Sequence, residues 1–356
     1  MHQESSMNLL KNSIEGYEIT SAKIACINFG IFKKNILEKI LKHKVKSIKE
    51  SQINDYDIVF IWGYLNINLN KVSSKVIFVE DGFIRSVGLG GHLSKPISWV
   101  FDNKGIYFNS NEESKLENIF LNITLNVSQI DKARKIKELI IKNSLSKYNL
   151  NKKEISNNLD YHKKNILVIG QVDDDMSIRY GAHNIKNNLD LLARVRSDYK
   201  NNIIIYKPHP DIEAGLRKNV FSKRQILNYA DHILYESSIE YAFNLSEKVI
   251  VNTSLAGFEA LIRNKHVVCY GEPFYSGWGL TKDKYLTSSG NRRTKKLNID
   301  ELIYGALVEY PIYFDYESYQ EIEIEEALNN LINMKPKQTW ITGLIQFLQK
   351  IKNFFR

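Results

Sequence analysis

Short apolar runs separated by polar, helix-forming segments dominate this chain. The runs are rich in Ile and Val, a composition typical of buried strands. In the first half we predict strands at residues 23–29, 57–62, 75–80 and 97–101. In the second half we predict strands at residues 165–170, 203–207, 232–235, 248–252 and 266–270. The regular spacing of the runs predicts a fold built around β-sheets.

Helical segments are predicted between these strands, at residues 36–44, 112–148, 185–199 and 255–263. Strands that alternate with helices favour parallel α/β sheets. A polar stretch, residues 149–164, separates the halves, and we interpret it as an interdomain linker. The pattern predicts an α/β fold with two Rossmann-like domains, which comprise residues 1–155 and 156–315, and a cleft between these domains. The alternative is one large doubly wound sheet.

The C-terminal residues 316–356 are predicted to be helical. Within them, residues 340–356 place seven apolar side chains on one helical face, with Lys350, Lys352 and Arg356 largely elsewhere. The apolar face comprises Trp340, Ile341, Leu344, Ile345, Leu348, Ile351 and Phe355. An amphipathic helix with a basic flank is suited to a membrane interface. The alternative is a terminal helix that packs back on the domains.

Composition narrows the class of protein. With 43% hydrophobic and 25% charged residues, the 356-residue chain has the composition of a soluble globular protein. Its net charge of +9 favours an anionic partner, either a phosphate-bearing ligand or an anionic membrane surface. No nucleic-acid motif occurs, so we expect no nucleic-acid partner. Cys26 and Cys269 lie in apolar runs and are expected to be reduced core residues.

The first residues and the apolar runs bear on location. Residues 1–20 lack the apolar region of a signal peptide, and no run approaches the roughly 18 apolar residues of a transmembrane helix. We therefore expect a cytoplasmic protein. If the terminal amphipathic helix binds lipid, the protein is also expected to contact the cytoplasmic face of the inner membrane.

Residues 166–177, ILVIGQVDDDMS, carry the most distinctive chemistry. A strand-like run ends at Gly170 and is followed by the consecutive acids 173–175, where open α/β sheets bind ligands. Gln171, Asp175 and Ser177 are candidate contacts. A carboxylate here can act as a covalent nucleophile or as an oxygen ligand for a metal. The alternative is a solvated loop in which Asp175 or Ser177 caps the next helix.

A second acidic motif, Glu80-Asp81-Gly82, ends the run at residues 75–80. A carboxylate at a strand terminus can project into a cleft as a general acid or base. Arg85 can pair with that carboxylate or hold an anion. The alternative is an ordinary Asp-Gly turn with a surface ion pair.

Two further strand ends suit a nucleotide. In Lys207-Pro208-His209-Pro210 the prolines stiffen the turn and fix a lysine and a histidine suited to phosphate. Ser254 begins a predicted helix whose free N–H groups can bind an anion, and Glu259 can accept hydrogen bonds from ribose. The alternative for Ser254 and Glu259 is an ordinary capping box.

A loop dense in aromatic residues and glycine follows the last predicted strand, at residues 271–281. Aromatic side chains in a loop indicate a platform or lid over a ligand. Phe274, Tyr275 and Trp278 are the candidates for this role. The alternative is a local hydrophobic plug.

In combination and in this order, the five segments resemble the bacterial capsule β-Kdo glycosyltransferases, the KpsC-like members of the capsule polysaccharide biosynthesis family. The resemblance spans roughly residues 75–285. Two successive α/β domains with a cleft correspond to the arrangement called GT-B. The matching motifs are EDGFIRSVGLG (80–90), QVDDDMS (171–177), KPHPD (207–211), the helix start at 254–259 and EPFYSGWGLT (272–281).

The resemblance implies a retaining transferase that uses CMP-β-Kdo and forms a covalent Kdo–aspartate intermediate. The motif of the family places the nucleophile at Asp175, within a pattern that includes Gln171 and Ser177. Glu80 becomes the acid/base, supported by Asp81. The donor-binding set implied by the resemblance is Lys207, His209, Ser254 and Glu259, with the first domain serving the acceptor.

The same resemblance implies no cofactor. A single CMP phosphate leaves, and Lys207, His209 and a helix N-terminus can stabilise it without a metal. The acids beside the nucleophile would raise its pKa unless a cation compensates, and Arg179 is a candidate. The expected acceptor is a glycolipid or oligosaccharide.

Two departures from the family pattern affect the interpretation. The large capsule enzymes carry two such modules, whereas this chain has room for one, and Met176 stands where a smaller residue is expected. One alternative is a metal-dependent glycosyltransferase for another nucleotide sugar, with Asp173 and Asp175 on Mn²⁺. The other alternative is a non-catalytic capsule assembly or export protein.

Overall fold

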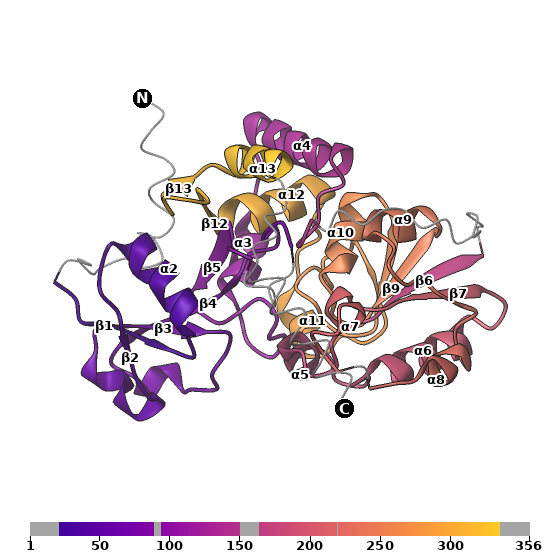
Figure 1. Ribbon diagram of the computed structural model, residues 1–356, viewed down its shortest axis with the longest axis horizontal. Coiled ribbons are helices and arrows are strands. Elements are labelled where there is room, and N and C mark those ends of the chain that lie inside the picture. The colour runs from indigo at the N-terminus through magenta and orange to yellow at the C-terminus, as the bar shows by residue number, and fades with distance from the viewer. Residues whose placement is uncertain (1–20, 89–93, 150–163, 219, 335–356) are drawn as a thin grey trace.

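The computed structural model describes residues 21–88, 94–149, 164–218 and 220–334, which form two β-sheets flanked by helices (Figure 1). The predicted mixed α/β class is confirmed. The described strands divide between the two sheets, so the alternative of a single doubly wound sheet is wrong. The apolar runs identified in the sequence supply the long central strands of both sheets.

The first sheet has seven strands and the second has six. From edge to edge, the first sheet runs β13 (Glu321–Ile322), β12 (Pro311–Phe314), β5 (Ser98–Asp102), β4 (Lys75–Asp81), β3 (Ile58–Trp62), β1 (Ile24–Ile27) and β2 (Lys46–Ser47). The second runs β11 (Lys282–Asp283), β10 (His266–Cys269), β9 (Lys248–Val251), β6 (Asn165–Ile169), β7 (Ile203–Lys207) and β8 (His232–Ile233).

Helices cover both sheets, and the predicted helical segment 112–148 divides into two of them. The helices before β6 are α2 (Ile31–Leu41), α3 (Lys115–Asn122) and α4 (Val127–Lys142). Those that follow β6 are α5 (Met176–Gly181), α6 (Asn188–Asp198), α7 (Pro210–Glu213), α8 (Lys223–Leu227), α9 (Ile239–Asn244), α10 (Ala256–Ile262), α11 (Ser288–Arg292), α12 (Ile299–Tyr304) and α13 (Ile324–Asn333).

The first sheet is parallel only from β2 to β4. Strand β5 runs antiparallel to β4, and β12 antiparallel to β5, so the expectation of a parallel sheet is wrong at this edge. The end of β4 lies beside the start of β5, where the N–H of Gly82 donates to the carbonyl of Ser98 at 3.0 Å. Every strand pair of the second sheet is parallel.

After the second sheet the chain returns to the first. Strands β12 and β13 extend the first sheet, and α12 packs against α4 (Figure 1). The return is fastened by ion pairs between Arg134 and Asp300 at 3.1 Å and between Lys132 and Glu323 at 2.8 Å. Division of the chain at residues 155 and 315 stays a prediction, but β12 pairs with the first sheet although its residues fall within the predicted donor domain.

A continuous apolar cluster joins the two halves. Phe83, which follows β4, stacks on Phe274, which follows β10, with 4.4 Å between ring centroids. Phe258 of α10 lies 5.3 Å from the same ring. Aromatic burial of this size fixes the two halves against each other, because each ring buries a large apolar area. The junction thereby determines where the two sets of strand ends meet.

Some predictions fall on other parts of the chain. Most of the predicted linker and the amphipathic segment 340–356 lie outside the described residues, so both stay predictions. Among the described helices, none combines the length and the apolar character needed to cross a bilayer. Cys26 and Cys269 are buried free thiols, as expected of reduced core residues.

Candidate active site

A cavity of about 840 Å³ lies between the two sheets, within the roughly 300–1,000 Å³ typical of small-ligand sites. The ends of β4, β6, β7 and β9 and residues 143–149 contribute to its walls. It brings together most of the residues singled out from the sequence, which are Glu80, Asp81, Gln171, Asp175, Ser177, Lys207, His209, Ser254 and Glu259.

Asp175 is both a helix cap and a cavity residue. It occupies the N-cap of α5, where its Oδ1 accepts a hydrogen bond from the N–H of Ser177 at 2.8 Å. Its Oδ2 makes no hydrogen bond with a described residue, and the side chain is exposed at the cavity. The cap orients the carboxylate by one oxygen and leaves the other for a ligand, so the two interpretations of this residue are compatible.

The other two acids of the triplet have different partners. Oδ1 of Asp173 accepts from the backbone and side-chain N–H groups of Asn188, at 3.1 and 3.0 Å, and burial raises the pKa of Asp173. Asp174 lies 3.5 Å from the guanidinium of Arg217. Arg179, the predicted compensating cation, forms no ion pair with a described acid. Arg217 was missed because no motif surrounds it and only folding brings it to the triplet.

Gln171 holds the loops after β6 and β9 together. It is buried, and its Oε1 accepts from the N–H of Thr253 at 2.8 Å. Its Nε2 donates to the hydroxyls of Thr253 and Ser177 at 3.1 and 3.3 Å. This network fixes the turn that carries Asp175. Thr253 was overlooked, although its position beside Ser254 in the same polar turn was an available signal.

Glu80 and Asp81 end β4 in unlike environments. Asp81 forms a largely buried ion pair with Arg85, Nε to Oδ2 at 2.7 Å, so the ion pair foreseen as an alternative exists but is not a surface pair. Burial, together with the charge of Asp81, raises the pKa of Glu80 from 4.5 to about 7. Glu80 is therefore suited to proton transfer near neutral pH, whereas Arg85 neutralises Asp81.

Two lysines in the cavity were not anticipated. Nζ of Lys33 lies 3.2 Å from the ring centroid of Trp62, and burial lowers the pKa of Lys33. Lys147 is half-buried in the segment that connects the two halves. Its N–H donates to Glu259 at 2.8 Å, and its carbonyl accepts from the N–H of Arg85 at 3.0 Å. The backbone of Lys147 thus ties the two halves of the site together, a role that leaves no local sequence signal.

The turn after β7 offers a neutral donor. Lys207 is already committed, because its Nζ lies 2.7 Å from Oε1 of Glu213 and both side chains are buried. Nδ1 of His209 accepts from the N–H of Asp211 at 3.1 Å, and burial lowers the pKa of His209. The neutral ring therefore carries its proton on Nε2, which makes no hydrogen bond with a described residue.

The start of α10 does not form the capping box considered from the sequence. Oγ of Ser254 accepts from the N–H of Ala256 at 3.3 Å, while Glu259 accepts from Lys147. Burial raises the pKa of Glu259. Ser254 and Glu259 both remain at the cavity wall, where they can meet a ligand.

The aromatic loop does not line the cavity between the sheets. Phe274, Tyr275 and Trp278 are 5%, 0% and 0% exposed. Nε1 of Trp278 donates to the carbonyl of Phe274 at 2.8 Å. Because the rings fill the junction between the sheets, they form the hydrophobic plug and do not cover the cavity as a lid.

Comparison with known proteins gives consistent matches. A family model described as capsule polysaccharide biosynthesis protein matches residues 66–319. The chain is 36% identical over 352 residues to the capsule polysaccharide modification protein LipA of Neisseria meningitidis serogroup B, covering 94% of this chain and 49% of LipA. It is 37% identical over 278 residues to the lipopolysaccharide-processing protein LpsZ of Rhizobium meliloti, covering 76% and 62%. The chain thus spans about half the length of LipA.

Two solved structures share the fold. The β-Kdo 2,7 transferase of Thermosulfurimonas dismutans KpsC has a TM-score of 0.73 and 35% identity, covering 87% of this chain and 99% of that one. The β-Kdo 2,4 transferase of the same KpsC has a TM-score of 0.74 and 27% identity, covering 87% and 98%. Each match includes nearly the whole of the solved chain.

Proposed function

Because the chain belongs to the capsule polysaccharide biosynthesis family and is KpsC-like, we propose that it is a retaining glycosyltransferase. It transfers β-Kdo from CMP-β-Kdo to a glycolipid or oligosaccharide acceptor of a capsule or related surface glycan. The observation that carries the proposal is the shared cavity, where Asp175 from the second half and Glu80 from the first face the same space. A GT-B arrangement accounts for a site divided in this way.

The proposed reaction proceeds by two displacements. The free oxygen of Asp175 attacks the anomeric carbon of Kdo, the bond to the CMP phosphate breaks, and CMP leaves with the bonding electrons. Glu80 then takes the proton of an acceptor hydroxyl, whose oxygen attacks the same carbon and expels Asp175. Two inversions retain the β configuration. The pKa of about 7 suits Glu80 to this proton transfer.

The remaining cavity residues suit donor binding. His209, through Nε2–H, and Arg217 face the leaving phosphate, while Ser254 and Glu259 contact the ribose. Lys207 supports the turn through its pair with Glu213 and acts on the phosphate indirectly. This set gives a singly linked phosphate hydrogen-bond donors and positive charge, so the proposed reaction uses no metal or cofactor.

We also propose a place for the reaction, at the cytoplasmic face of the inner membrane. Support comes from the basic amphipathic pattern of residues 340–356 and from the glycolipid acceptor class.

Incubation with CMP-Kdo followed by intact-mass analysis tests the proposal. A covalent Kdo adduct is expected on the wild-type protein and none on Asp175→Ala, which keeps CMP binding. Asp131→Ala, at an exposed position outside the cavity, is the matched control and is expected to form the adduct. Full transfer activity in Asp175→Ala would contradict the assignment of Asp175 as the nucleophile. Loss of activity in EDTA would favour the metal-dependent alternative, and no thermal shift with CMP would favour a non-catalytic protein.

A further inference from the structure

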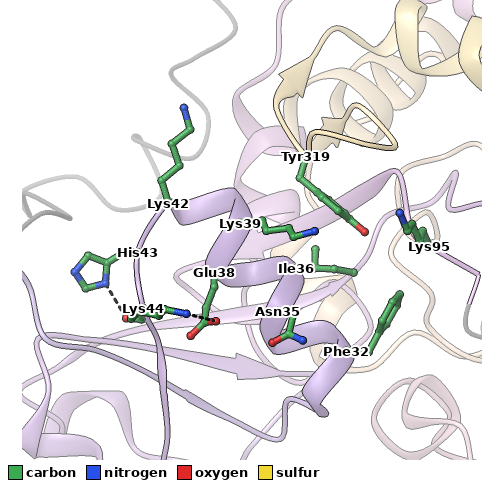
Figure 2. Close-up of a pocket in the computed structure, with 10 residues that line it drawn as sticks. All are labelled: Phe32, Asn35, Ile36, Glu38, Lys39, Lys42, His43, Lys44, Lys95 and Tyr319. Atoms are coloured by element: carbon green, nitrogen blue, oxygen red, sulfur yellow. Dashed lines mark hydrogen bonds and ion pairs between the residues drawn. The ribbon is translucent and has the colours of Figure 1, made fainter.

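A second cavity, of about 520 Å³, opens on the first half of the chain beside α2 (Figure 2). It shares no lining residue with the cavity between the sheets. Phe32, Ile36 and Tyr319 supply its apolar part, and four lysines with one carboxylate supply most of its charge. We call it the α2 groove. Its volume falls within the range of small-ligand sites, roughly 300–1,000 Å³.

The α2 groove carries uncompensated positive charge. Its one carboxylate, Glu38, is already paired with Lys34 at 2.9 Å and with Lys44 at 3.7 Å. Lys39 and Lys95, by contrast, form no ion pair with a described residue. A concave site lined by one sign of charge attracts ligands of the opposite sign.

Two of these lysines converge on one aromatic ring. Nζ of Lys39 lies 5.1 Å and Nζ of Lys95 5.7 Å from the ring centroid of Tyr319, and Figure 2 shows them on either side of it. Like charges repel, and neither lysine forms an ion pair with a described carboxylate. Anionic groups bound beside the two ammonium groups would relieve this repulsion.

The position of that ring is fixed by the backbone. Tyr319 is buried and has a φ of 59°, in the left-handed region that residues with a Cβ rarely adopt. The turn that imposes it is closed by Asp315, whose N–H donates to the carbonyl of Gln320 at 2.8 Å. The ring is therefore held in place before any ligand arrives.

We propose that the α2 groove binds an acidic saccharide, namely carboxylate-bearing sugars already present on the acceptor. The proposal rests on the proposed function, because each transferred Kdo adds a carboxylate to the growing chain. The carboxylates of neighbouring sugars pair with Lys39 and with Lys95, one on each side of the buried Tyr319 ring, and an apolar face of the sugar packs against Phe32. The first sheet, which carries the groove, belongs to the half predicted to serve the acceptor.

Binding is measured by calorimetry with a short Kdo oligosaccharide and its carboxyl-reduced form, in the Asp175→Ala background so that no turnover occurs. Lys39→Ala with Lys95→Ala is expected to weaken binding of the acidic form by about three- to tenfold, the sum expected for two exposed ion pairs. Lys49→Ala, exposed and outside the groove, is the control and is expected to change nothing. The reduced form is expected to bind equally weakly to both proteins.

A kinetic measurement separates this site from the catalytic one. In the otherwise wild-type protein the lysine variant is expected to raise KM for an oligosaccharide acceptor, with kcat unchanged and KM for a single-sugar acceptor unchanged. Equal affinities of the variant and the parent would overturn the proposal. So would lysine-dependent binding to phosphatidylglycerol vesicles without saccharide binding. Absence of Kdo transfer would contradict the proposed function and leave the binding result intact.

Discussion

Glu80 makes a prediction that combines stability with function. The replacement Glu80→Gln removes a carboxylate whose pKa rises from 4.5 to about 7 on folding. Below the lower value the carboxyl is protonated in both states. As the pH rises towards 7 the unfolded chain releases this proton first, so the folded state is progressively destabilised. The contribution of this group to the free energy of unfolding is therefore fully present below pH 4.5 and is lost as the pH rises to about 7.

The magnitude follows from the pKa difference. At about 1.4 kcal/mol per pH unit, the difference between 4.5 and about 7 corresponds to roughly 3 kcal/mol above pH 7. Water in the adjoining cavity screens part of this, so we expect Glu80→Gln to be more stable than wild type by about 2 kcal/mol near pH 8. Near pH 5 the expected difference falls to about 1 kcal/mol or less.

Urea unfolding followed by circular dichroism at the two pH values measures this difference. Exposed Glu50→Gln is the control and is expected to leave stability unchanged at both. Glu80→Gln is also expected to lose Kdo transfer, because the amide cannot take a proton. A stability difference that does not vary with pH would refute the reasoning. A gain in stability with loss of activity would show that the site holds a destabilising group for its chemistry.

Three other replacements test separate parts of the structure. Asp81→Asn leaves Arg85 buried and unpaired, and is expected to lower the free energy of unfolding by about 3 kcal/mol in urea titrations, with part regained when Arg85→Met is added. Phe274→Ala removes the ring that joins the two halves and is expected to cost about 3–5 kcal/mol by the same assay, whereas Phe274→Leu costs less. His209→Ala is expected to lower kcat for Kdo transfer by about 100-fold in steady-state assays, while Arg179→Ala retains activity; equal rates in the two variants would contradict the role of His209.

The strands formed by the apolar runs, and the candidate chemistry at their ends, could be predicted from the amino-acid sequence. Apolar runs such as residues 166–169 and 203–206 are short and rich in Ile and Val. This pattern is typical of buried strands, so it predicts strands directly. Parallel strands end at the same edge, and this alone brings Gln171, Asp175 and His209 together. The antiparallel direction of β5 was not predicted, because the apolar pattern of a strand does not specify its direction.

The burial and the partners of each side chain could not be predicted from the sequence and depend on the fold. The motif predicts that Lys207 binds phosphate, whereas in the fold Lys207 forms an ion pair with Glu213. The pKa of Glu80 is raised because its carboxyl group is buried beside Asp81. The aromatic residues at 274–278 were predicted to form a platform or lid, but in the fold they are buried between the two halves. Burial and partnership arise between residues distant along the chain, and desolvation and charge act over a few ångströms in space. The local sequence therefore identifies the candidate chemical groups of the site, and the environment of each group in the fold determines its role.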